Sequence, residues 1–253
     1  MKPKKADLKV VTAIIAAILV GIIILILIFG KMGPTLTDVA ERQACANDIA
    51  IKSHTTIFTE SPYKYINCHT HFIDVSTDGI VKDGKKINEQ QVNPDDIKRL
   101  FANEMYDCWY QFGAGQNSPF GGQTAISCII CSQIEIDDFA DEGELSIPNG
   151  ELYDFDEWIR NHRVGSYAVS ASDSREFYYD YFGRNKDPQM PYYERLQQSA
   201  SVNDYADPRD IHIETGNTYI IGVIGLPLSY NMVPFYTKIE YMGNEIERCW
   251  HLY

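Results

Sequence analysis

The stretch TAISCIICSQIEI, residues Thr124–Ile136, decides the fold of the larger part of the chain. Its apolar, β-branched character is typical of a strand buried on both faces at the centre of a sheet. Further strand patterns occur upstream, over Tyr63–Val75, and near the C-terminus, over Thr218–Leu226 and Phe235–Tyr241. The last of these alternates in side-chain character, as a strand with two different faces does. Together with the helical patterns between them, these segments predict an α+β domain with a mostly antiparallel sheet.

A hairpin and a helix are expected between the first two of these strands. The Asp83-Gly84 pair separates two short runs and is a two-residue turn typical of a β-hairpin. Asn93 is placed to cap the helix that follows, Pro94 takes its first position, and Gly113 ends it. The apolar face of this helix consists of Ile97, Leu100, Phe101, Met105, Cys108 and Phe112. Shorter helices are expected over Thr37–Ser53, Phe155–Arg160 and Ser174–Phe182.

A long apolar run, VVTAIIAAILVGIIILILIF, occupies residues Val10–Phe29. At about 1.5 Å per residue, a helix of this length spans roughly the 30 Å of a bilayer's hydrocarbon core. Lysines at positions 2, 4, 5 and 9 precede the run, so the positive-inside rule places the N-terminus in the cytoplasm. The expected organisation is a cytoplasmic tail over residues 1–9, a transmembrane helix over 10–29, a juxtamembrane linker and helix over 30–53, and an extracytoplasmic domain over 54–253.

The same run allows two kinds of N-terminus. Its length exceeds that of a signal-peptide core, and no A-x-A-like cleavage site follows Gly30, which favours an uncleaved signal-anchor. The pair Lys5-Ala6 before a charged residue and a long apolar helix is loosely similar to prepilin-type signals, although Lys9 fits that alternative poorly. Processing there would leave a helix that packs in the core of a filament. We expect the anchored form: a single-pass protein of the plasma membrane with its C-terminal domain outside.

The charge balance restricts the partners of the outer domain. The formal net charge is −13, and since residues 1–9 contribute +3 (four Lys against one Asp), the remainder carries −16. An exterior this acidic repels phosphate backbones and excludes nucleic acid as an expected partner. It is compatible with divalent cations or with a partner of basic surface.

Disulfides are the first interpretation of the cysteines. In an exported domain an even number of cysteines indicates a disulfide framework. The six cysteines are Cys45, Cys68, Cys108, Cys128, Cys131 and Cys249. Residues three apart in a strand point to opposite faces, so Cys128 and Cys131 are expected to bridge to different partners, such as Cys108, unless the strand bends. A labile C-x-x-C redox pair and a metal site that also uses Cys108 stay open as alternatives.

The sharpest metal candidate is the string Cys68-His69-Thr70-His71-Phe72-Ile73-Asp74. In a strand, His69 and His71 share one face about 7 Å apart, an arrangement used to hold one metal ion such as zinc. The candidate ligands are therefore His69, His71 and Asp74. The string is similar to the H-x-H strand of metal-dependent amidohydrolases and TatD-like nucleases, but the β/α alternation of their barrel is missing here. The alternative is two strand histidines that bind no metal.

Calcium is a second possible cofactor. Asp74-x-Ser76-x-Asp78-Gly79 resembles the start of an EF-hand loop, but Lys85 stands where the loop needs a bidentate Glu. A turn before the hairpin explains the same residues. The acidic loop over residues 137–144 could also hold calcium or simply be a solvated face.

One block of sequence resembles uncharacterised archaeal single-pass membrane proteins. It consists of the segment MYDCWYQFGAG from Met105, a loop with Pro119-Phe120, and CIICS from Cys128, a DCWYxFGxG…CxxC pattern. The resemblance implies an archaeal cell-envelope protein and carries no known activity. It also suggests that the helix bearing Cys108 packs on the strand bearing Cys128 and Cys131.

Two classes of function follow. The favoured one is a membrane-anchored extracytoplasmic protein that acts by binding, as a cell-envelope or membrane-complex subunit with a protein partner or a second copy of itself. The alternative is an extracytoplasmic enzyme. It would be a metal-dependent hydrolase through His69 and His71, or a thiol-disulfide enzyme through Cys128 and Cys131. No catalytic residue is assigned.

Overall fold

A computed structural model describes part of the chain: residues 18–21, 40–51, 68–113, 127–139, 147, 150–164, 177–183, 213–225, 232–239 and 249–251. The chain divides into two units, Met1–Glu41 and Arg42–Tyr253. In the first unit residues 18–21 are helical, and the rest of the expected membrane helix over 10–29 lies outside the described residues. Within the described ranges, no helix is both long and apolar enough to cross a membrane.

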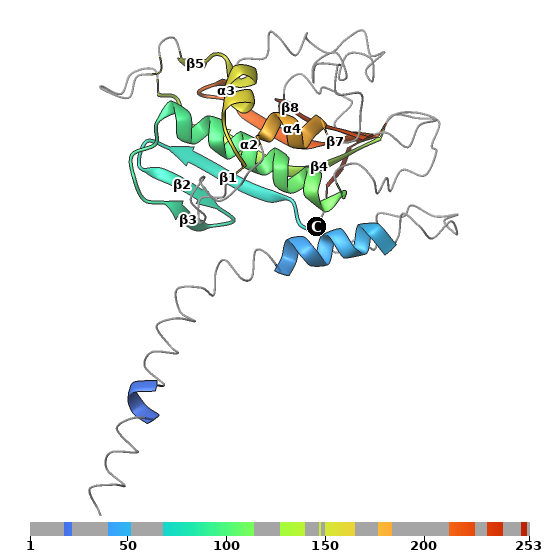
Figure 1. Cartoon of the computed structure of the whole chain (residues 1–253). Helices are drawn as coiled ribbons and strands as arrows, with labels where there is room; N and C mark the ends of the chain where they lie inside the picture. The colour runs from blue at the N-terminus through green and yellow to red at the C-terminus, as the bar shows by residue number, and fades with distance from the viewer. Residues whose placement is uncertain are drawn as a thin grey trace, which may run out of the picture. The chain divides into compact units, whose positions relative to one another are not determined.

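The second unit is built on a seven-stranded sheet (Figure 1). Its strands are β1 (His71–Ser76), β2 (Gly79–Lys82), β3 (Lys85–Asn88), β4 (Ser127–Ile136), β7 (Thr218–Gly225), β8 (Met232–Lys238) and β9 (Cys249–His251). They lie in the order β3-β2-β1-β4-β7-β8, and β9 also pairs with β4. β4 is parallel to β1 and β9, and the other pairs are antiparallel, so the predicted mostly antiparallel sheet is confirmed. A separate ribbon joins β5 (Glu151–Leu152) to β6 (Ile213–Glu214).

The central strand β4 contains a β-bulge at Cys131. Ile130 pairs with Gly222 and Ser132 pairs with Ile221, so Cys131 is the extra residue. A bulge of this kind lets two consecutive side chains face the same side of a sheet. The consequence is that the side chains of both Cys131 and Ser132 reach the helix that covers this face.

That helix is α2 (Pro94–Gln111), and it forms as the sequence predicts. Asn93 caps it reciprocally with Asp96, and Gly113 follows its end with a left-handed φ of 58°. Its predicted apolar face is confirmed, since every one of those side chains is buried. In Figure 1, α2 lies across the sheet, where it contacts β4, β7 and β8.

Two shorter helices, α3 (Phe155–Asn161) and α4 (Tyr178–Gly183), pack beside α2. Aromatic rings join these layers: Phe101 of α2 makes edge-to-face contacts with Tyr219 and Tyr236 of the sheet and with Phe155 of α3. The third expected helix is described over residues 40–51. Parts of the expected segments, at residues 63–67, 124–126 and 174–176, and the end of the last strand at residues 240 and 241, lie outside the described residues.

Disulfides tie these elements together, as the cysteine count predicts. Cys45 in the helix over 40–51 is bridged to Cys68, and Cys108 of α2 is bridged to Cys131 of β4. All four are buried. Cys128 is disulfide-bonded as well, and β4 and β9 place its backbone opposite Cys249. Cys131 is bonded to Cys108 and not to Cys128, so these residues form neither a C-x-x-C bridge nor a thiolate metal site in this structure.

Candidate metal centre

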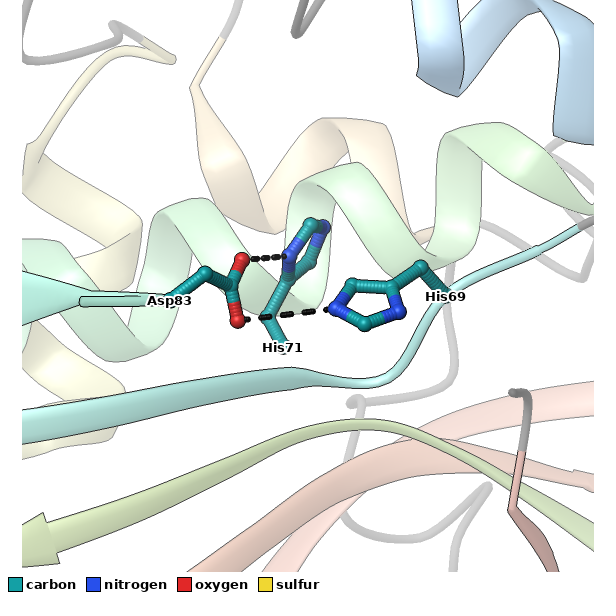
Figure 2. A group of neighbouring side chains, drawn as sticks. All are labelled: His69, His71 and Asp83. Carbon is teal, nitrogen blue, oxygen red and sulfur yellow. Dashed lines mark hydrogen bonds and ion pairs between the residues drawn. The ribbon is translucent and has the colours of Figure 1, made fainter. Parts of the chain in front are cut away.

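The two histidines of the H-x-H string lie together at the start of β1. His71 is the first residue of the strand, and His69 precedes it by two positions. Their ring centroids are 5.5 Å apart, with the planes nearly perpendicular (Figure 2). His69 is the outer residue, with 57% of its side chain exposed, whereas only 18% of the His71 side chain is exposed.

The third member of the group is Asp83, at the turn between β2 and β3. Its φ of 50° is the left-handed conformation that the first residue of such a two-residue turn adopts. The backbone N–H of Asp83 donates to the carbonyl of Phe72 at 2.8 Å. The N–H of Phe72 in turn donates to Oδ1 of Asp83 at 2.9 Å. These reciprocal hydrogen bonds fix the carboxylate beside β1, at the residue that follows His71.

The carboxylate of Asp83 faces both imidazole rings. Its Oδ2 lies 2.6 Å from Nδ1 of His71, and its Oδ1 lies 3.6 Å from Nε2 of His69. One potential ligand atom from each residue lies within 4.8 Å of the other two. Partial burial raises the pKa of Asp83, but the N–H of Phe72 and the two histidines lower it by more, so the pKa is below its usual value.

Asp74, the carboxylate expected in this group, lies elsewhere. It is exposed and occupies the alternate position to Ile73 and Val75, whose side chains are buried on the α2 side of β1. It therefore faces away from His71, and Asp83 stands in its place. The residues that resemble a calcium loop form the end of β1 and the two-residue turn at 77–78, which supports the hairpin interpretation. Of the acidic loop over 137–144, residues 140–144 lie outside the described part.

A buried polar cluster adjoins this group beneath α2. Lys82 of β2 pairs with Ile73, and Ser132 of β4 pairs with His71, so adjacent strands bring these polar side chains to the α2 face. Glu104 of α2 accepts hydrogen bonds from both: from Lys82 Nζ at 2.6 Å and from Ser132 Oγ at 2.6 Å. One helical turn on, Asp107 forms an ion pair with Arg42.

The pKa values of Glu104 and Asp107 are shifted in opposite directions. Burial raises the pKa of Glu104, but the charges of Lys82 and His71 and the hydrogen bonds from Lys82 and Ser132 lower it by more, so it lies below its usual value. The pKa of Asp107 is raised, because burial and the charge of Glu104 outweigh Arg42 and Lys82. Burial lowers the pKa of Lys82, and the nearby carboxylates raise it by more.

Sequence reasoning found both histidines and missed Asp83. Strand pairing gave no signal for it, because counting along β1 and β2 places position 83 opposite Phe72, which lies on the other face of β1 from His71. Glu104 was missed too, since the pattern of α2 marks it only as one polar residue among apolar ones.

Comparison with protein-family models, with curated proteins and with solved structures finds no match to this chain.

Proposed function

We propose that this is a single-pass membrane-anchored extracytoplasmic protein that acts by binding, as a subunit of the cell envelope or of a membrane complex. The observation that carries the proposal is the pair of buried bridges, Cys45–Cys68 and Cys108–Cys131, each of which joins separate elements. Such bridges form and persist in oxidising compartments and are rare in the cytosol. The apolar run of Val10–Phe29 behind its lysines supplies the anchor and the orientation.

The surface chemistry supports a binding role towards a protein. The net charge of the outer part suits a partner of basic surface or a cation-mediated contact, and it disfavours nucleic acid. Beside the histidines, Phe72 leaves 51% of its surface exposed on the face of β1 that also carries Asp74. A large exposed aromatic side chain is the type of residue enriched at interfaces. The alternative partner is a second copy of this chain, in a homo-oligomer. The resemblance to archaeal single-pass membrane proteins fits an envelope setting.

An extracytoplasmic metal-dependent hydrolase stays the alternative, and the group formed by His69, His71 and Asp83 favours it. A thiol-disulfide enzyme is disfavoured, because such an enzyme needs an accessible, exchangeable pair. Here Cys131 is 3% exposed, and its partner Cys108 is 1% exposed.

The test is membrane topology combined with native complex size. The full chain, tagged at its N-terminus, is expressed in cells, and the membranes are extracted at alkaline pH. We expect the chain to stay in the membrane pellet. External protease should digest the domain but not the tag, and mild detergent should release a complex larger than one chain. Release from the membrane at alkaline pH would overturn the anchoring, and a C-terminal domain protected from external protease would overturn its outward orientation. A strictly monomeric particle would overturn the subunit role.

A further inference from the structure

We propose that His69, His71 and Asp83 bind one borderline divalent cation of the zinc class at the surface of the domain. The proposal does not depend on whether the chain is anchored in a membrane, since the site uses only residues at or just before the start of β1 and of the hairpin that follows. Figure 2 shows the three side chains.

The first argument is that the ligands are positioned by backbone structure. Asp83 is held by its left-handed turn conformation and by the two hydrogen bonds with Phe72. His71 lies in β1, and the Cys68 bridge anchors the chain one residue before His69. A metal site needs ligands whose orientation is set in advance, and these come from rigid elements of the fold.

The second argument is distance. In a tetrahedral zinc site with bonds of about 2.0–2.2 Å, ligand atoms lie about 3.4 Å from one another. The 3.6 Å between Nε2 of His69 and Oδ1 of Asp83 already matches this separation. The 2.6 Å between Nδ1 of His71 and Oδ2 of Asp83 is a hydrogen bond that must lengthen by less than about 1 Å for both atoms to bind the ion. The two distances run to different oxygens of the Asp83 carboxylate, of which one would be the ligand. The three candidate ligand atoms lie within 4.8 Å of one another, so they must draw together by at most about 1.4 Å.

The third argument concerns which cation fits. Two imidazole nitrogens with one carboxylate suit zinc and related transition metals, whereas calcium and magnesium prefer oxygen ligands alone. Three protein ligands leave at least one coordination position of a tetrahedral ion open. Because the side chain of His69 is 57% exposed, that position faces solvent and can take water or a side chain of a partner.

The competing explanation is that the His71–Asp83 contact only stabilises the hairpin. The two explanations assign different roles to His69. Its imidazole lies beyond normal hydrogen-bonding distance from the Asp83 carboxylate, so it contributes little to the hairpin but is needed as a metal ligand.

The test is a zinc titration of the metal-stripped full chain in detergent, with a chromophoric chelator as competitor and Co²⁺ absorption as a second readout. We expect one equivalent of zinc and a tetrahedral cobalt spectrum. His69→Ala, at an exposed position, should weaken binding tenfold or more. Asp83→Asn should do the same, since Asn tolerates the left-handed turn. Asp74→Asn is the matched control on the opposite face of β1 and should leave affinity unchanged.

Several results would overturn the site. These are no zinc uptake by the wild-type chain, equal affinity in the wild type and His69→Ala, or an equal loss in Asp74→Asn and Asp83→Asn. Near-ultraviolet circular dichroism establishes that each variant is folded. If Asp83→Asn fails to fold, His69→Ala decides the question alone.

Discussion

Replacing Lys82 with methionine should destabilise the domain more than any exposed lysine substitution does. Its Nζ lies 2.6 Å from Oε1 of Glu104, and only 17% and 5% of the two side chains are exposed. At 4 Å and an effective dielectric constant of 20, two unit charges attract by about 4 kcal/mol. Removing one partner of such a buried pair leaves the other charge uncompensated and costs about 3–5 kcal/mol. For a domain of this size, each kcal/mol lowers Tm by roughly 2–4 °C, so the expected drop is about 6–20 °C.

The assay is thermal unfolding of the full chain in detergent without reductant, monitored by tryptophan fluorescence. Lys85→Met, at an exposed position of the neighbouring strand, is the matched control and should change stability by no more than about 0.5 kcal/mol. The double variant Lys82→Met/Glu104→Met should recover most of the loss, because it removes both buried charges. The Ser132 hydroxyl then lacks its acceptor, which costs about 1 kcal/mol of stability.

The loss of stability in Lys82→Met should also depend on pH. Because the pKa of Glu104 is lowered in the folded state, its ionised form contributes stability above the usual Glu pKa, and this contribution is lost as the pH falls through the lowered value. In Lys82→Met the uncompensated carboxylate should take up a proton more readily. The stability difference from wild type should therefore be greatest near neutral pH and smaller in acid. A Tm drop below about 2 °C at neutral pH, or a double variant as unstable as the sum of the single variants, would refute the reasoning.

Two further variants test the packing of β4, and a third, in the turn between β2 and β3, is their control. Cys108→Ala/Cys131→Ala removes a disulfide that spans 23 positions in sequence. The loop entropy of the unfolded chain predicts a loss of about 3 kcal/mol of stability, measured as a lower Tm without reductant. An unchanged Tm would contradict this. Gly222→Ala places a Cβ 2.2 Å from the carbonyl oxygen of Ile129 and should cost about 3 kcal/mol or prevent folding. Gly84→Ala meets no atom within 4 Å and loses only its left-handed turn preference, about 1 kcal/mol; equal losses in the two glycine variants would show that the close approach is not what matters.

The sequence was informative where structure is local. The cap at Asn93, the Asp83-Gly84 turn and the buried face of α2 were all predicted, because each depends on residues within a few positions of one another. The central position of β4 followed from its continuous apolar character, which only a strand covered on both faces can accommodate.

What the sequence did not reveal depends on register. The bulge at Cys131 adds one residue to β4 and so turns Ser132 towards α2, and no local pattern marks it. The choice of Asp83 over Asp74 depends on the turn: the left-handed conformation of Asp83 and its hydrogen bonds with Phe72 hold its carboxylate beside His71, whereas Asp74 lies on the other face of β1. The cluster around Glu104 assembles from β2, β4 and α2, and charged residues in those segments individually suggest exposed positions.

The central claim is that an outward-facing domain is held together by disulfides in an oxidising compartment. The most direct measurement is mass mapping of the cysteines in the full chain isolated from membranes, after free thiols are blocked by alkylation in intact cells. The proposal predicts linked peptides for Cys45–Cys68 and Cys108–Cys131, a third link between Cys128 and Cys249, and no alkylated cysteine. Alkylated cysteines, or a peptide linking Cys128 to Cys131, would contradict it.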